Sequence, residues 1–237
     1  MKLPRPLQLM FLLAAVWLPA HADLGEKRPP AEPKVALVPG TDVAGLPRVL
    51  IIGDSISGGY TPIVREQLRG RANVHRYDEN SRDTNYGLTR LDFWLDAGRW
   101  DVIHFNFGLH DLKHVNAAGE MVPVAQGRRV STQAQYEGNL RQIVARLKQT
   151  GARLVFATTT PIPVGANGRV AGSELPFNEA ARKIMAENGV PIDDLHALAA
   201  PRLAEIQKPA NVHYTDAGYA LLAAQVRDSI VALLPAR

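Results

Sequence analysis

Short apolar segments alternate with amphipathic segments along most of this chain, and this alternation limits the fold more than any other feature. Five segments are short and rich in β-branched residues, as in strands buried on both faces of a sheet: residues 48–53, 73–77, 101–107, 153–159 and 190–192. Between them, apolar residues recur at three- and four-residue spacing, which predicts helices at residues 62–68, 88–95, 132–149, 178–188 and 216–234. The pattern predicts an α/β fold, a three-layer α/β/α sandwich around a five-stranded, mostly parallel sheet.

Composition narrows the class of protein. The 237 residues are 46% hydrophobic and 21% charged, enough apolar material for one folded domain. There is no cysteine, which excludes disulfides, thiolate nucleophiles and cysteine-based zinc sites. The formal net charge of +4 falls to +2 when Lys2 and Arg5 are set aside with the N-terminal segment. This small excess does not indicate nucleic acid or another polyanion as a partner.

The N-terminus has the pattern of an export signal. Lys2 and Arg5 precede an apolar run over residues 7–18, and Ala20-His21-Ala22 offers a small-x-small cleavage site. The run is shorter than the roughly 20 residues that span a bilayer. We therefore expect a signal peptide over residues 1–22, a periplasmic or secreted location, and no stable membrane insertion after cleavage. Residues 23–47 are rich in proline and predict an extended leader to a domain over residues 48–237.

Two polar segments stand out at the predicted carboxyl ends of the strands, where α/β sheets bind ligands. Ser55 follows Gly53 and Asp54 directly after the first strand, so a rigid turn would expose its hydroxyl. The ordinary alternative is a serine that caps a helix. His213 lies just before Thr215, the expected N-cap of the last helix. A neutral imidazole there could take the proton of Ser55 and return it to a leaving alcohol.

These two segments resemble the first and last blocks of the SGNH hydrolases, the GDSL-type esterases and lipases. Block order and spacing match from about Arg48 to Leu234. The resemblance implies the flavodoxin-like SGNH hydrolase fold, Ser55 as nucleophile, His213 as base, and no cofactor. It also implies an oxyanion hole formed by the amides of Ser55 and of a second-block glycine. The best match for that glycine is Gly87, although residues 80–81 offer competing donors.

The chain departs from the family pattern at two places. The third block normally reads Gly-x-Asn-Asp, but here it reads Gly108-Leu109-His110-Asp111, so His110 would replace the asparagine as an oxyanion donor. A neutral imidazole donates from one nitrogen only, so the tautomer of His110 decides whether it can serve as this donor. The triad acid is expected three residues before His213, where Ala210 stands. Asn211, Asp194 or a backbone carbonyl could orient His213 instead.

Two other classes of function use the same residues. His110 and His114 flank an acid with the spacing of H-E-x-x-H, and His104 is close in sequence, but a strand and a glycine precede this segment where a zinc site needs a long helix. We expect no metal. The missing acid at Ala210 would also fit a non-catalytic domain that binds a carbohydrate or acyl ligand.

The function predicted from the sequence is an exported serine ester hydrolase. It would cleave short-chain acyl esters, including carbohydrate O-acetyl esters, of a small-molecule or glycan substrate, without a cofactor or nucleic acid. Tyr60, Tyr86 and Tyr214 fall on the predicted rims and could shape an acyl or sugar pocket. The loop from Thr158 to about Ser173 is long enough for a substrate-binding flap, and the ordinary alternative is a surface loop without a binding role.

Overall fold

The computed structural model describes residues 37–38 and 42–235. The predicted signal peptide and most of the predicted leader lie outside the described residues. These residues belong to one compact unit that begins at Val35. None of its described helices is long and apolar enough to cross a membrane.

A mostly parallel sheet forms the centre of this unit, as predicted. Its five parallel strands are β2 (Arg48–Ile52), β3 (Asn73–Tyr77), β4 (Val102–Phe105), β7 (Arg153–Ala157) and β8 (Ile192–Asp193). A short strand that the sequence did not predict, β1 (Leu37–Val38), pairs antiparallel with β3 at one edge. The sheet order is β1-β3-β2-β4-β7-β8. The chain therefore reverses direction across the sheet between β2 and β4, and ligands bind outside the carboxyl ends at such a point.

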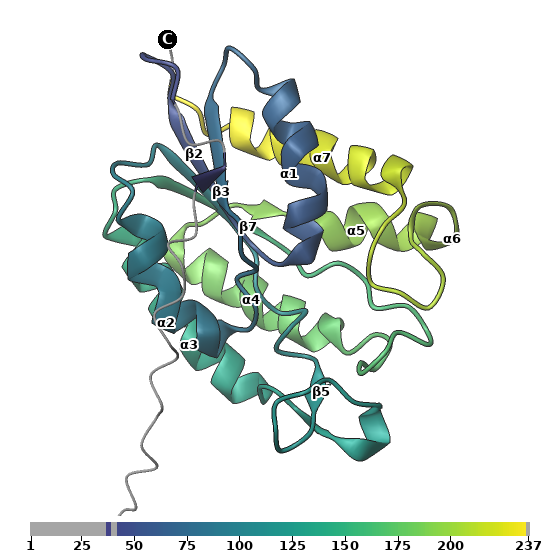
Figure 1. Cartoon of the computed structure of the whole chain (residues 1–237). Coiled ribbons are helices and arrows are strands. Elements are labelled where there is room, and N and C mark those ends of the chain that lie inside the picture. The colour runs from purple at the N-terminus through teal and green to yellow at the C-terminus, as the bar shows by residue number, and fades with distance from the viewer. Residues whose placement is uncertain (1–36, 39–41, 236–237) are drawn as a thin grey trace, which may run out of the picture. The chain divides into compact units, whose positions relative to one another are not determined.

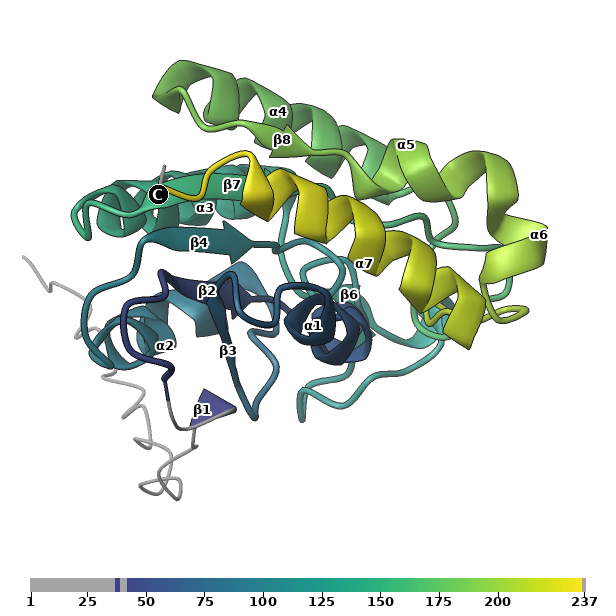
Figure 2. The ribbon, with the colours of Figure 1, turned by 90° about the horizontal axis from the view of Figure 1, so that it is seen from above.

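Helices cover both faces of the sheet (Figures 1 and 2). One face carries α1 (Ser55–Gln67) and α7 (Asp216–Val231), and the other carries α2 (Thr84–Leu95), α3 (Gln133–Lys148) and α4 (Glu174–Asn188). The predicted helices are confirmed, but α1, α2 and α4 begin four to seven residues earlier than the apolar spacing indicated. The first turns of α1 and α2 contain few large apolar residues, and the signals for their starts are the capping side chains of Asp54 and Asp83.

Several short elements complete the chain. They lie in the connections that leave the carboxyl ends of β4 and β8, and they are too short to show a periodic pattern: β5 (His114–Val115), η1 (Val124–Gln126), β6 (Arg128–Arg129), α5 (Leu195–Ala199), η2 (Ala200–Arg202) and α6 (Leu203–Ile206). β5 and β6 pair antiparallel as a separate two-stranded sheet.

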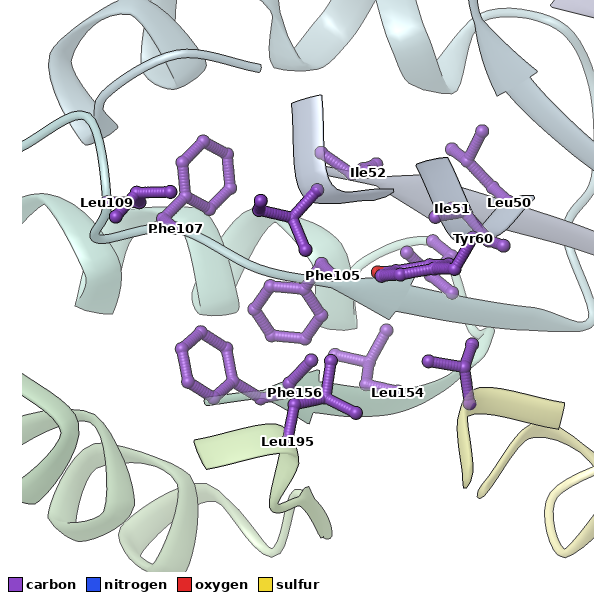
Figure 3. Packing of buried hydrophobic residues seen from close by; sticks show 14 of the residues in the cluster. Leu50, Ile51, Ile52, Tyr60, Phe105, Phe107, Leu109, Leu154, Phe156 and Leu195 are labelled. Carbon is purple, nitrogen blue, oxygen red and sulfur yellow. The ribbon is translucent and has the colours of Figure 1, made fainter. Parts of the chain in front are cut away.

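Strand side chains and aromatic rings make up the core (Figure 3). Phe105 of β4 and Phe156 of β7 are fully buried and meet edge to face with ring centroids 5.3 Å apart. Leu50, Ile51 and Ile52 of β2 are at most 3% exposed. Burying apolar surface stabilises the folded state by about 25 cal/mol per Å². This buried layer is therefore the rigid base that holds the loops at the strand ends.

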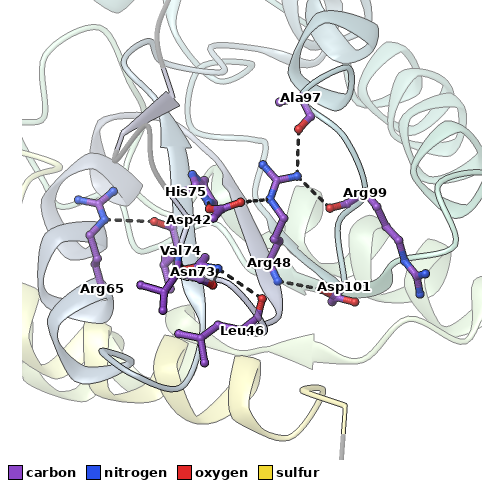
Figure 4. Close-up of polar contacts among 11 residues, drawn as sticks. Asp42, Leu46, Arg48, Arg65, Asn73, Val74, His75, Ala97, Arg99 and Asp101 are labelled. Carbon is purple, nitrogen blue, oxygen red and sulfur yellow. Dashed lines mark hydrogen bonds and ion pairs between the residues drawn. The ribbon is translucent and has the colours of Figure 1, made fainter.

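Polar contacts at the amino ends of the strands anchor the segment before β2 (Figure 4). Arg48 donates to Asp42 at 2.6 Å and to the carbonyl of Ala97 at 2.9 Å. Asn73 donates to the carbonyl of Val43 at 3.0 Å. Residues 42–47, which the sequence assigned to the leader, are therefore part of the folded body.

Candidate active site

The predicted nucleophile lies where β2 connects to α1, in a turn over residues 53–57 that is named the nucleophile turn. Ser55 is the first residue of α1, and the N-cap is Asp54, whose carboxylate accepts from the Ile56 amide at 2.9 Å. Ser55 is thus not the helix cap, and its hydroxyl is free for another partner. A Cβ at Gly53 would lie 2.8 Å from the Cβ of Ser57, so the close approach of strand and helix requires glycine there.

The hydroxyl of Ser55 meets the imidazole of His213, as the sequence predicted. Ser55 Oγ lies 2.8 Å from His213 Nε2. The loop that carries His213 is closed by a bridge between Gln207 and Tyr214 and by a bond from the Lys208 amide to the His213 carbonyl at 2.9 Å. Thr215 caps α7, accepting from the Gly218 amide at 3.1 Å. Two residues far apart in sequence are therefore held at hydrogen-bond distance by rigid elements.

Asn211 orients His213. Its Oδ1 lies 3.0 Å from the His213 backbone nitrogen and 2.8 Å from His213 Nδ1. A backbone N–H only donates, so this atom of Asn211 is the oxygen, and Nδ1 of the ring must carry the proton. Nε2 is then the free acceptor that a general base needs. Ala210, where the family acid would stand, has φ of 50°, and this left-handed residue directs the chain so that Asn211 faces the ring.

Because its partner is an amide, His213 has no carboxylate in contact among the described residues. Burial lowers the pKa of His213 from its ordinary value; the charge of Asp54 opposes this shift, while Lys208 and Arg169 add to it. The imidazole therefore stays neutral, and able to accept a proton, at lower pH than an ordinary histidine.

Asp194, the second candidate for orienting His213, has other partners. It caps α5 by accepting from the Ala197 amide at 3.1 Å, and it pairs with Arg182 at 2.6 Å and with the Thr158 hydroxyl at 3.0 Å. Burial opposes ionisation, but these hydrogen bonds outweigh it and lower the pKa of Asp194. The hypothesis that Asp194 replaces the triad acid is wrong, because the carboxylate is used in a cap.

His110 follows β4 and is mostly buried. Lys113 Nζ lies 2.9 Å from His110 Nδ1, and an ammonium only donates, so the neutral ring carries its proton on Nε2. Burial lowers the pKa of His110 to about 4; Asp54 opposes this shift and Lys113 adds to it. His110 is therefore a neutral donor with one N–H, the tautomer that an oxyanion donor at Nε2 requires.

Asp111 holds the loop of His110 to its neighbours. Its buried carboxylate accepts from the hydroxyl of Thr84 at 2.6 Å and from the hydroxyl of Ser131 at 2.7 Å. Burial raises the pKa of Asp111 to about 6 although these hydrogen bonds oppose the shift. Gly108 has φ of 142°, and a Cβ there would lie 2.2 Å from the Thr159 hydroxyl. The loop is thus fixed from two sides.

The prediction for Gly87 is wrong. Gly87 is the fourth residue of α2, and its amide donates to the Asp83 carbonyl at 2.9 Å within the helix. A Cβ at this position would lie 2.5 Å from the Phe107 ring. The glycine serves close packing, and its amide is already bonded. The error arose because α2 begins at Thr84, four residues before the apolar spacing becomes visible.

Arg82 is a residue that sequence reasoning missed. The amide of Ser81 donates to the Gly53 carbonyl at 3.1 Å, which brings this loop against the nucleophile turn. Arg82 has φ of 53°, and its amide has no hydrogen-bond partner within residues 42–235. A left-handed arginine carries no recognisable sequence signal, since glycine is the residue that marks such positions.

Arg76 of β3 supports the turn from the other side. It donates to the Ser57 hydroxyl at 3.0 Å and to the Asp54 carbonyl at 3.1 Å. Burial lowers its pKa, while nearby acids raise it. The signal that could have found Arg76 is a cation one residue before the carboxyl end of a buried strand.

The zinc hypothesis does not fit the geometry. His110 and His114 lie in a turn and a short strand, not on one helix face. Lys113 occupies one nitrogen of His110, His114 Nδ1 faces the Gly168 carbonyl at 3.2 Å, and His104 pairs with Asp193 at 2.9 Å. Within the described part of the chain, no three His, Asp or Glu side chains gather to hold a metal.

The rim tyrosines are mostly core residues. Tyr60 and Tyr214 are at most 1% exposed, and Tyr60 borders only a small void of about 10 Å³ under the turn that carries Ser55. Tyr86 is half-buried, donates to Glu79 at 3.1 Å and lies under the Arg82 guanidinium. The loop after β7 is anchored where Asn178 bonds both backbone groups of Thr159 at 2.8 Å.

Comparison with known families identifies the fold and its chemistry. The GDSL-like lipase/acylhydrolase family model matches residues 51–221. The chain belongs to this family. It is a carboxylic ester hydrolase of the GDSL type, as the resemblance implied. No curated protein matched the sequence.

Solved structures share the fold of this hydrolase at low sequence identity. The lipase/acylhydrolase from Enterococcus faecalis is 19% identical, with a TM-score of 0.66 over 81% of this chain and 99% of that one. The acetylxylan esterase Axe2 from Geobacillus stearothermophilus is 17% identical, with a TM-score of 0.62 over 78% and 94%. A member of the lipolytic G-D-S-L family from Veillonella parvula is 18% identical, with a TM-score of 0.59 over 78% and 98%.

Proposed function

We propose that this hydrolase cleaves short-chain acyl esters through Ser55, His213 and Asn211. The observation that carries the proposal is the 2.8 Å contact between Ser55 Oγ and His213 Nε2, with Asn211 Oδ1 on the opposite ring nitrogen. Ser55 attacks the acyl carbonyl carbon while His213 takes the hydroxyl proton, and His213 then gives that proton to the leaving alcohol. Water, deprotonated by His213, releases the acid from the acyl-enzyme.

Three donors would stabilise the oxyanion. They are the amide of Ser55, the amide of Arg82 and the Nε2–H of His110, in place of the amide of Gly87. The unpartnered Arg82 amide beside the nucleophile turn and the Nε2–H tautomer of His110 support this set. Removing one such donor from an enzyme costs about 10²–10³ in rate.

The small buried space under the nucleophile turn favours a short acyl group over a long one. A void of about 10 Å³ lies there, lined by side chains that include Ile56, Asn106 and Leu109. This is about the volume that holds one water molecule, so it offers no tunnel for a long chain. The acetylxylan esterase among the structural neighbours acts on acetyl groups of a glycan, which supports carbohydrate O-acetyl esters as substrates here.

Export remains part of the proposal. The charged, apolar and small-residue regions of residues 1–22 support a cleaved signal peptide and a periplasmic or secreted enzyme. Expression of the full chain with a Gram-negative host, followed by fractionation and N-terminal sequencing, tests it. A mature protein that begins at Asp23 in the periplasm or medium supports export, and an uncleaved cytoplasmic chain contradicts it.

Covalent labelling tests the mechanism without a guess about the substrate. The purified protein and its Ser55→Ala variant are treated with a fluorophosphonate, and labelled peptides are mapped by mass spectrometry. We expect stoichiometric label on Ser55 in the wild type and none in the variant, unchanged by a chelator. A folded wild type that stays unlabelled while a control esterase reacts would contradict the serine mechanism and favour the binding domain.

Chain length is tested with p-nitrophenyl esters. We expect kcat/KM to fall from acetate to butyrate to octanoate, and acetate to be released from an acetylated oligosaccharide. A preference for octanoate would contradict the short-chain proposal.

A further inference from the structure

Two cations beside the candidate active site have no carboxylate partner. Arg169 lies in the loop after β7, is 9% exposed, and donates from Nε to the Leu109 carbonyl at 2.8 Å. Its guanidinium is therefore next to His110. Lys113 is half-buried and donates to His110 Nδ1. Within residues 42–235, neither forms an ion pair with an acidic side chain.

A buried cation of this kind costs stability unless an anion neutralises it. Burial lowers the pKa of Arg169 and lowers that of Lys113 to about 8; the charge of Asp54 opposes both shifts but is not in contact. The proposed mechanism uses Lys113 to orient His110 and has no step for Arg169. By contrast, Arg48 at the amino ends of the strands pairs directly with Asp42.

A groove lies on the two segments that carry these cations. Its volume is about 590 Å³, which is enough for a small ligand chain. Its wall includes His114 and Val170, the residues that follow Lys113 and Arg169 in sequence, and the His114 amide joins the two segments by donating to the Gly168 carbonyl at 2.8 Å. Arg128 and Arg129 also line it. Arg128 is exposed and, like Arg129, forms no ion pair with the other described residues.

The lining of the groove indicates the chemistry of its occupant. Two valines contribute to the wall, together with the polar side chains of Thr132, Gln135 and Ser173. A few well-placed polar groups in such a groove fix the orientation of a ligand, and here they include two arginines. Guanidinium groups suit carboxylates, which they bind with two parallel hydrogen bonds.

We propose that the substrate is an O-acylated acidic saccharide, in which Arg169 and Lys113 bind a carboxylate near the scissile ester and the arginines of the groove bind neighbouring acidic sugars. This inference rests on the proposed esterase function. It assigns the groove to the alcohol half of the ester and leaves the acyl half at the nucleophile turn.

A matched pair of esters tests the first part. 3-Acetoxybenzoate carries a carboxylate, and 3-acetoxybenzamide is its neutral counterpart; both rates are normalised to alkaline hydrolysis. We expect the wild type to favour the carboxylate by at least about tenfold in kcat/KM, as a charged hydrogen bond provides. Arg169→Gln brings the ratio close to one. Arg99→Gln, an exposed arginine at the amino ends of the strands, keeps the wild-type ratio.

A saccharide inhibitor tests the groove. Trigalacturonate, with neutral galactotriose as control, is added to the hydrolysis of p-nitrophenyl acetate. We expect trigalacturonate to inhibit and galactotriose not to inhibit. Salt should weaken the inhibition, and Arg128→Gln should raise the inhibition constant by about fivefold or more. Arg128 is exposed, so this variant remains informative if Arg169→Gln does not fold.

The outcomes separate this inference from the proposed function. Equal rates on the two acetoxy esters, no inhibition by trigalacturonate, or a carboxylate preference that survives in folded Arg169→Gln would overturn the acidic-saccharide proposal while leaving the esterase intact. A wild type that hydrolyses neither ester and takes no fluorophosphonate label on Ser55 would instead overturn the proposed function.

Discussion

Two histidines in this hydrolase have partners of opposite kinds. His104 and Asp193 form a fully buried pair at 2.9 Å, and Gln225 and Ser229 of α7 also donate to that carboxylate. His213 is half-buried in the loop before α7, and its partner is an amide, Asn211, where a triad acid would be. The carboxylate of Asp193 thus has a structural role, since it joins β4, β8 and α7. His213, which contacts the hydroxyl of Ser55, has a neutral partner instead.

The difference shows what each partner does for an imidazole. A carboxylate would stabilise the protonated ring, whereas an amide oxygen orients the ring without adding charge. At His213 burial and nearby cations therefore dominate and lower the pKa. A carboxylate would both orient the imidazole of His213 and raise its basicity, whereas Asn211 only orients it.

The largest effect is expected from removing the histidine that meets Ser55. His213→Ala should lower kcat by about 10³-fold or more, because general-base catalysis is lost, with little change in thermal stability at this half-exposed position. His196→Ala, at a histidine that pairs with Glu174, should keep most of the activity. Steady-state kinetics on p-nitrophenyl acetate make the comparison, and equal losses in the two variants would disprove the role of His213.

Removing the buried carboxylate of Asp193 should lower stability rather than activity. Asp193→Asn leaves the donors of His104 and Gln225 poorly matched in the core and should lower the free energy of unfolding by about 3 kcal/mol. The exposed control Asp92→Asn should change it by less than about 0.5 kcal/mol. Urea unfolding followed by circular dichroism measures both. A stable Asp193→Asn that loses kcat would reverse the assignment of roles.

Restoring a carboxylate next to His213 sharpens the comparison. The wild type needs neutral His213, so its kcat/KM should fall on the acidic side with a midpoint below 6.5, the ordinary value for histidine. In Asn211→Asp a charged partner favours the protonated ring, so this limb should move up by about one pH unit and kcat/KM at pH 8 should rise about tenfold.

Asn211→Ala is the control for that experiment. It removes the acceptor without adding charge, so kcat/KM should fall and the acidic limb should not rise. An acidic limb in Asn211→Asp at the same pH as in the wild type would show that residue 211 does not face the reacting ring.

The smallest effect on activity is expected at Asp194. Asp194→Ala removes the cap of α5 and should cost about 1 kcal/mol of stability, with kcat/KM changed less than about twofold. If its loss of activity exceeded that of Asn211→Ala, the assignment of Asn211 as the residue that orients His213 would fail.

The sequence predicted the sheet better than the helix starts. Short runs such as residues 48–52 are recognisable because strands buried on both faces need β-branched residues throughout. α1 was predicted from Pro62 although it begins at Ser55, because its first turns contain glycines and small polar residues. The same kind of error at α2 produced the wrong assignment of Gly87 to the oxyanion hole.

At the site, the motif residues were predictable and their partners were not. Ser55 and His213 stand in recognisable segments, whereas the choice between Asn211 and Asp194 depends on the left-handed backbone of Ala210 and on the cap of α5. Arg82 shows the same limit, since its positive φ follows from contacts of the loop with Gly53 and not from its own side chain.

The sequence by itself predicted the α/β class and the segments that carry Ser55 and His213, because these follow from hydrophobic period and from short motifs within single segments. Only the tertiary structure decided what orients His213, which nitrogen of His110 carries the proton, and that Arg169 and Lys113 lie together beside the site. These properties depend on distances between segments far apart in the chain and on the backbone angles of single residues. Neither can be obtained from the net charge or from the spacing of residues in the sequence.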